Sequence, residues 1–348
     1  MLIAHEGYFG VGEMSVPLHQ ISNNNNQTKN STKMKQKVLV LFLAVITLGL
    51  TSCNSNDDET GIVIEGIDLS KDVDCCSAEE ALQVYKFIQT VRIIPELSTS
   101  VDGLYDVWAY SKTGTLHKGY NDLYFVVTKK KTGNYVKYFD IKNITPLMHM
   151  VKMDMWHSTP VGSTFEVFDT TRPAVKQGWV SLLMNTSDAG SWQFSYDIEV
   201  LGSKGGVQKQ AIKVDALPDG QDWLKNFKIG DDTYFLSLVN PSDWKTGKNT
   251  IQAYVSKKSN PITTPYALAT ETFTIEIDPR MPDMGNHTSP DNTPLVKQKD
   301  GSYTGNINLT MTGLWRIHLT VRDAEGNIVA GGDDLKDGFS SLYWDVTL

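Results

Sequence analysis

The sequence predicts an all-β fold in which two β-sandwich domains follow one another. The chain has 348 residues, enough for two domains that each bury a core. Apolar and polar residues alternate with period two in many segments, among them LYDVWAY, DLYFVVT, WQFSYDIEV, TYFLSLV, TFTIEI and WRIHLTV. Clusters of Gly, Asn, Asp, Pro and Ser separate these segments, and one helical turn is expected near AEEALQVYKF. An internal repeat is the third observation behind the prediction.

The repeat indicates that the two domains are copies of one unit. Gly119 and Asn121 reappear 128 positions later as Gly247 and Asn249, and Met153 matches Met281 at the same offset. After a loop of different length the similarity resumes. The matched residues there are Met184, Gly190 and Trp192 in the first unit and Met311, Gly313 and Trp315 in the second. We therefore expect two tandem immunoglobulin-like β-sandwiches.

The domain boundaries follow from the repeat and from composition. We expect the first sandwich at residues 66–203 and the second at 207–348, joined by the Gly-rich linker LGSKGGVQ at 201–208. Three segments precede them: an upstream extension at 1–33, a signal peptide at 34–52 and a polar tether at 53–65.

The predicted signal peptide contains a thirteen-residue apolar run, VLVLFLAVITLGL, behind Lys35 and Lys37. This run is too short to span a bilayer and has the length of a signal-peptide core. It ends in LTSC, which resembles the lipobox of bacterial lipoproteins, so Cys53 is the expected lipidated N-terminus. The next residues, NSNDDE, resemble the surface-export signal of Bacteroidetes-type lipoproteins, although a plain solvated linker has the same composition. These features predict a cell-envelope protein anchored to the outer membrane through Cys53, either periplasmic or surface-exposed.

Charge and cysteine content exclude several classes of protein. The chain carries 32 basic and 40 acidic side chains and has no long basic patch, so nucleic acid is not an expected partner. After Cys53, only Cys75 and Cys76 remain, and neighbouring cysteines cannot form a disulfide framework. They are compatible with a vicinal disulfide, two free thiols or soft-metal ligands. Catalytic sequence motifs are missing, which predicts a protein that is not an enzyme.

Methionine and histidine cluster at two places in the sequence. The segment PLMHMVKMDMWHSTP, residues 146–160, holds Met148, His149, Met150, Met153, Met155 and His157, and DPRMPDMGNHTSP holds Met281, Met284 and His287. Thioether and imidazole are the ligands that select Cu(I), which makes all nine residues candidate copper ligands. In an extended strand Met148 and Met150 share one face, as do Met153 and Met155. The alternative is that the methionines fill irregular gaps in the core.

The segment MPDMGNH followed by LTMTGLWRIHLTV resembles the YtkA-like and FixH-like domain over about residues 250–325. The residues that carry the resemblance are Met281, Pro282, Met284, His287, Gly313 and Trp315. The resemblance implies a β-sandwich with an extracytoplasmic role in copper handling, and a copper-donating or copper-accepting envelope protein as partner. The first unit departs from this pattern, because MDMWH lacks the proline and brings the histidine closer.

Two functions remain open from the sequence. The first is a membrane-anchored lipoprotein that binds copper through the methionine and histidine loops for trafficking, buffering or resistance. The second is a surface adhesion or glycan-binding lipoprotein, in which the sandwiches are structural modules without metal and tryptophans stack on sugar rings.

Overall fold

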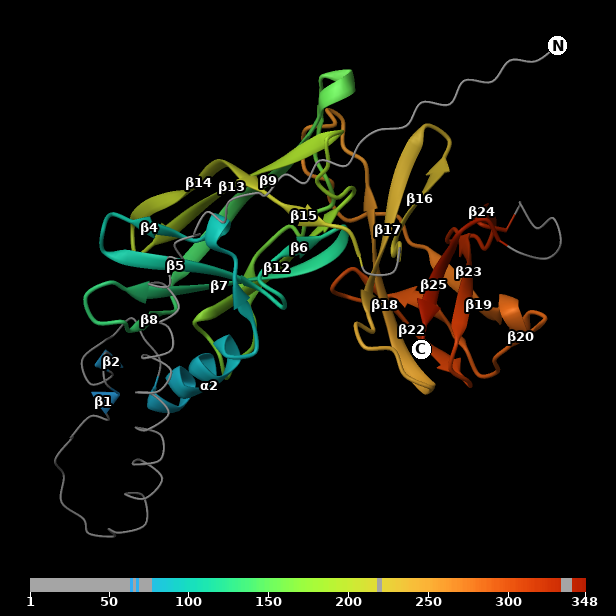
Figure 1. Cartoon of the computed structure of the whole chain (residues 1–348), viewed down its shortest axis with the longest axis horizontal. Coiled ribbons are helices and arrows are strands. Elements are labelled where there is room, and N and C mark those ends of the chain that lie inside the picture. Colours follow the sequence, from blue (N-terminus) through green and yellow to red (C-terminus); the bar gives the residue numbers. More distant parts are fainter. Residues whose placement is uncertain (1–62, 65–66, 69–76, 218–220, 333–339) are drawn as a thin grey trace, which may run out of the picture. The chain divides into compact units, whose positions relative to one another are not determined.

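The computed structural model describes residues 63–64, 67–68, 77–217, 221–332 and 340–348. The predicted extension, signal peptide, Cys53, most of the tether, Cys75 and Cys76 lie outside these residues. The described part of the chain is nearly all β (Figure 1), which confirms the predicted fold class. All of it belongs to the unit Thr60–Leu348. Within the described residues, no helix is both long and apolar enough to cross a membrane.

The elements of the N-terminal half run in the following order: β1 (Val63–Ile64), β2 (Ile67–Asp68), α2 (Ala78–Ile88), β3 (Arg92–Ile93), η1 (Pro95–Leu97), β4 (Thr99–Val101), β5 (Tyr105–Ser111), β6 (Leu116–His117), β7 (Gly119–Lys129), β8 (Tyr135–Val136), β9 (Phe139–Met150), η2 (Val151–Met153), β10 (Met155–His157), β11 (Glu166–Val167), β12 (Val175–Leu182), β13 (Gly190–Val200), β14 (Ser203–Ile212) and β15 (Val214–Asp215).

Those of the C-terminal half are β16 (Leu224–Ile229), β17 (Asp232–Asn240), β18 (Gly247–Lys257), β19 (Thr274–Met281), η4 (Pro282–Met284), β20 (His287–Thr288), β21 (Thr293–Lys297), β22 (Ser302–Leu309), β23 (Leu314–Arg322), β24 (Ile328–Ala330) and β25 (Tyr343–Thr347).

Helix α2 confirms the one helical segment expected from the sequence. Ser77 and Glu80 form a capping box at its N-terminus, each side chain bonding to the other residue's backbone N–H. Its buried face, which includes Val84 and Phe87, packs with Tyr110 of β5 and Val126 of β7 in a small separate cluster.

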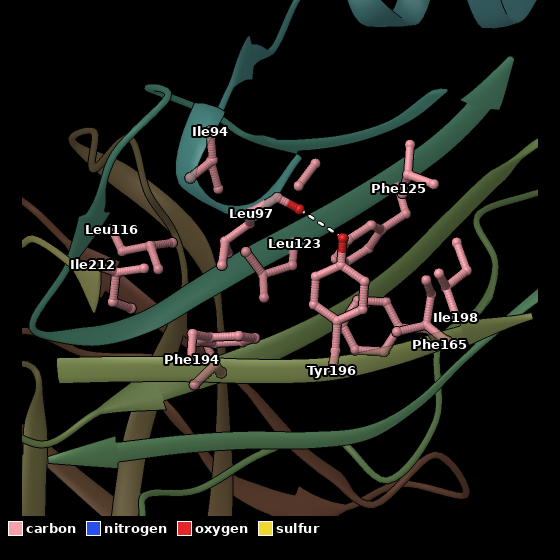
Figure 2. Close-up of a cluster of buried hydrophobic side chains, with 14 of the residues drawn as sticks. Ile94, Leu97, Leu116, Leu123, Phe125, Phe165, Phe194, Tyr196, Ile198 and Ile212 are labelled. Atoms are coloured by element: carbon pink, nitrogen blue, oxygen red, sulfur yellow. Dashed lines mark hydrogen bonds between the residues drawn. The ribbon is translucent and has the colours of Figure 1, made fainter. Parts of the chain in front are cut away.

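Two sheets enclose the core of the N-terminal half. One has the strand order β10-β9-β13-β14, and the other has the order β11-β12-β7-β5-β3 with β4 and β8 added. Alternate residues of β13 and β7 point inward, so Phe194 and Tyr196 meet Leu123 and Phe125 in one cluster (Figure 2). The Tyr196 hydroxyl donates a hydrogen bond of 2.7 Å to the Leu97 carbonyl, the dashed line in Figure 2.

The C-terminal half is built on one sheet of ten strands. Its main order is β16-β17-β18-β22-β21-β19-β23-β24, with β20 paired to β19 and β25 paired to β23. The sheet surrounds a second core whose largest side chains are Tyr303, Trp315 and Trp344, all at most 1% exposed.

The predicted linker at 201–208 is wrong, because most of that segment belongs to a strand. Residues from Ser203 to Ile212 form β14, which pairs antiparallel with β13 across a β-bulge. A Cβ at Gly205 would lie 2.7 Å from Val101 Cγ2, and one at Gly206 would collide with the Tyr196 carbonyl. The glycines therefore mark close packing of backbone against its neighbours, and β14 extends the first sheet beyond the expected boundary at 203.

The two halves touch through the outer faces of β12 and β17–β18. The Ser181 and Ser237 hydroxyls are hydrogen-bonded at 2.7 Å and fully buried. The Trp179 ring stacks on Tyr254, with 4.6 Å between ring centroids and 10° between planes. Polar and aromatic contacts thus join the two halves.

Candidate functional site

The methionines and histidine of the C-terminal half lie on the hairpin from β19 to β20. Pro282 opens the short 3-10 helix η4, and Gly285 ends it in the left-handed region at φ 61°. The chain then reverses, and the Asn286 N–H donates to the Met281 carbonyl at 3.0 Å. As a result Met281 and His287 are direct partners in the register of the two strands.

The three predicted ligands of this hairpin differ in exposure. Met281 is 2% exposed and belongs to the core, whereas Met284 is 53% exposed and His287 is exposed. The Met281 methyl packs against Gly313, where a Cβ would lie 2.9 Å from Met281 Cε. Met281 therefore also has the core-filling role of the alternative interpretation, while Met284 and His287 are accessible.

Met311 is linked to this group through Trp315. The Trp315 indole N–H donates to the Met311 carbonyl at 2.9 Å, and the Trp315 ring centroid lies 6.4 Å from that of His287. Met311 is half-buried and packs on the same core as Met281. Sequence reasoning did not place Met311 among the ligands, although its repeat match with Met184 was the available signal.

The corresponding hairpin of the N-terminal half runs from β9 to β10. In its register Met150 faces Met155, His149 faces Trp156, and Met148 faces His157. Directly paired residues share a face, so Met148, Met150, Met155 and His157 lie on the inner face. On the outer face, His149 stacks on Trp156 at 4.4 Å and its Nε2 is 2.9 Å from the Asp154 carboxylate. The structure thus separates His149 from the other candidates on these strands.

The expectation that Met153 and Met155 share a face of one strand is wrong. Strand β9 ends at Met150, and Val151–Met153 form the 3-10 helix η2. Asp154 then takes the left-handed conformation at φ 44°, which aspartate tolerates better than most residues. Met153 lies on this turn and is 57% exposed.

His157 is held in the form that binds metals. Its Nδ1 is 2.8 Å from the Ser158 carbonyl, and because a carbonyl only accepts, Nδ1 carries the proton and Nε2 keeps its lone pair. The ring is 7% exposed, and this burial lowers its pKa below 6.5, with the Ser158 hydrogen bond acting in the opposite direction. The imidazole is therefore neutral at pH 7.

Both halves place a methionine, a histidine and a tryptophan together. Met148 is the direct partner of His157 on one side and of Trp192 on the other. The Trp192 ring centroid is 6.0 Å from that of His157, and its indole N–H donates to the Met184 carbonyl at 2.9 Å. The set Met148, His157, Trp192 and Met184 thus corresponds to Met281, His287, Trp315 and Met311.

This register corrects the predicted match of Met153 with Met281. Met148 is the counterpart of Met281, and both are nearly inaccessible, at 0% and 2%. Met153 and Met284 instead share the last position of the turn before the left-handed residue. The constant offset fails here because the first hairpin is three residues longer between its methionine and its histidine.

The chemistry of these residues fits a soft cation. Thioether sulfur and a neutral imidazole are the donor types that select Cu(I), and the thioether needs no deprotonation to coordinate. Across the residues that the structure describes, these hairpins included, no group of three or more His, Cys, Asp or Glu side chains could hold a metal ion. A metal site at either hairpin would need the methionine thioethers as ligands.

Comparison with curated proteins gives no match to this chain. A family model gives one, and its residues run from the start of the β17 hairpin through most of β23. They include Met281, Met284, His287 and Trp315. Residues 230–320 are therefore identified as a YtkA-like domain.

Proposed function

We propose that this chain is a lipid-anchored protein of the cell envelope that binds copper, as Cu(I), through its two methionine-bearing hairpins. The observation that carries the proposal is the recurrence of one arrangement in both halves: a methionine directly opposite a histidine, beside a tryptophan whose indole is held by a second methionine's carbonyl. A histidine therefore stands opposite the buried methionine in both halves, buried in the first and exposed in the second.

The YtkA-like domain supports the same conclusion, since that family is associated with copper-related, extracytoplasmic proteins. The signal peptide and the lipidated Cys53 lie outside the described residues, so the envelope location rests on the apolar run and the LTSC motif. Trafficking, buffering and resistance all need reversible binding and no catalysis, and the exposed His287 suits an exchangeable ion.

The test is an anaerobic titration of Cu(I) against a chromogenic chelator, using residues 54–348, which contain the whole compact unit. We expect the Met281→Leu, His287→Ala variant to bind more than about tenfold more weakly at one site, since even supporting residues of metal sites have effects of that size. His117→Ala, outside both hairpins, is the control and keeps the wild-type affinity. Equal affinity of the wild type, the double variant and the control contradicts the proposal. The adhesion or glycan-binding function would then be favoured.

A further inference from the structure

We propose that the two hairpins are copper sites with different exchange rates: the β19–β20 hairpin exchanges its ion readily, and the β9–β10 hairpin retains it. This inference rests on the proposed copper binding and assigns a separate role to each half of the chain.

The β19–β20 hairpin presents two of its proposed ligands to solvent. His287 is exposed and Met284 is 53% exposed, and both lie at or beside the tip of the turn. Strand β20 has only two residues, and its pairing is with β19. A chelating partner could therefore reach the imidazole and one thioether directly, displacing them stepwise while Met281 stays packed against Gly313.

The β9–β10 hairpin is closed by contrast. His157 is 7% exposed and Met148 is fully buried. The segment that follows His157 is tied to the C-terminal half, because Ser158 N–H donates to the Ile262 carbonyl at 2.7 Å. Tyr266 continues this attachment, donating its N–H to the Thr159 carbonyl at 3.0 Å and accepting from Val161 at 3.1 Å. The His157 imidazole is joined to the same segment, because its Nδ1 donates to the Ser158 carbonyl at 2.8 Å.

The two hairpins also differ in their donor atoms, and this difference too favours retention of the ion at the β9–β10 hairpin. The longer first hairpin adds the pair Met150 and Met155 to the inner face, next to Met148 and His157. Met150 and Met184 pack on the same core as Met148. The first site therefore offers more thioether sulfur than the second, where Met281, Met284 and Met311 are the available methionines. More soft donors and slower opening both favour retention of Cu(I).

This difference assigns the docking region of a copper-exchanging partner to the β19–β20 turn. Such a partner must supply its own soft donors, thiolates or thioethers, within reach of Met284 and His287. The first hairpin would then hold an ion that leaves only when the attachment through Ser158, Thr159 and Val161 opens.

The experiment is stopped-flow removal of copper from the Cu(I)-loaded chain of residues 54–348 by an excess of a chromogenic Cu(I) chelator. We expect two phases that differ by at least about tenfold in rate, because local opening must precede release from the closed site. His287→Ala removes the fast phase and leaves the slow one. Met150→Leu, Met155→Leu, a volume-conserving change at half-buried positions, speeds the slow phase or removes it.

Val151→Ala is the matched control, since Val151 lies between these two methionines on the exposed turn and its side chain has no donor atom; it leaves both phases unchanged. A single phase, or a slow phase that belongs to the second hairpin, overturns this inference while copper binding itself stands. Failure of the wild-type chain to retain any Cu(I) before mixing rejects the proposed function and this inference together. Circular dichroism of each variant verifies that it is folded.

Discussion

Met148 lies between His157 and Trp192, as the direct partner of each in neighbouring strands of one sheet. Its methyl end also packs against Gly190, which leaves no space for a side chain there. Three strands, β10, β9 and β13, therefore bring together residues that are up to 44 positions apart in the sequence. The Gly-x-Trp pattern has a physical cause here: the glycine accommodates the methionine, and the tryptophan covers it.

The first prediction concerns this close contact. In Gly190→Ala, the added Cβ collides with Met148 Cε and lies 2.8 Å from the His149 carbonyl. We expect a loss of about 1–3 kcal/mol in the free energy of unfolding, the usual cost of overpacking, measured by urea denaturation. Leucine lacks the terminal methyl, so the same change in a Met148→Leu background should cost less. An equal cost in both backgrounds would show that Met148 is not the obstacle.

The second prediction uses the two repeated asparagines. The Asn121 amide donates to the His117 carbonyl at 2.7 Å and the Gly119 carbonyl at 2.8 Å, and its oxygen accepts from the His117 N–H. Asn249 makes the same three bonds to Lys245 and Gly247. Both residues are nearly inaccessible, at 6% and 4%.

We therefore expect Asn121→Ala and Asn249→Ala each to lower the free energy of unfolding by about 1–3 kcal/mol, because buried backbone groups lose their partners. Asn226→Ala, at an exposed position of β16, is the control and should change stability by less than about 0.5 kcal/mol. Chemical denaturation measures all three. A small effect at Asn121 together with a large effect at Asn249 would argue that the two turns are not equivalent.

Period-two alternation was sufficient to predict several of the long strands. DLYFVVT lies within β7, WQFSYDIEV within β13 and WRIHLTV within β23. Trp192 and Trp315, at equivalent repeat positions, are 1% and 0% exposed. These features depend on local pattern and burial, which a single sequence records directly.

The site was harder to predict, because it depends on register. Which methionine faces a histidine is decided by the length of each hairpin turn, and the first turn contains no glycine or proline to reveal it. The glycines of β14 were misleading, because Gly205 and Gly206 are typical of a linker. In the structure they are required by tight packing, Gly205 against Val101 and Gly206 against Tyr196. Exposure of Met284 and burial of Met281 likewise follow from the turn geometry.

The third prediction is a pH dependence of stability. His318 is 7% exposed, and burial lowers its pKa below 6.5, opposed by its hydrogen bond of 3.1 Å to the Ser340 carbonyl and by Asp278. A histidine whose pKa is lower in the folded state contributes stability above its unfolded pKa, and this contribution is lost as the pH falls through the folded pKa.

Stability should therefore decrease as the pH falls below 6.5, by at most about 1.4 kcal/mol per pH unit for each such histidine. His117 and His157 shift in the same direction for the same reason. Glu271, whose pKa is lowered from 4.5 to about 2, affects stability only at lower pH. In His318→Gln, denaturation at a series of pH values should show a shallower slope; a slope identical to that of the wild type would exclude His318 as a contributor.

The fourth prediction tests the contact between the two halves. Ser181 of β12 and Ser237 of β17 are 0% and 1% exposed, and their hydroxyls are 2.7 Å apart.

Replacing either serine by alanine leaves the other hydroxyl buried without this partner, so each single variant should lose about 1–3 kcal/mol in the free energy of unfolding. The double variant removes both polar groups and should cost less than the sum of the singles, with a coupling energy of about 0.5–3 kcal/mol. Guanidinium denaturation of the four proteins measures this coupling. Strictly additive losses would mean that the two serines do not interact in solution, and that the halves are held together by other contacts, such as the stack of Trp179 on Tyr254.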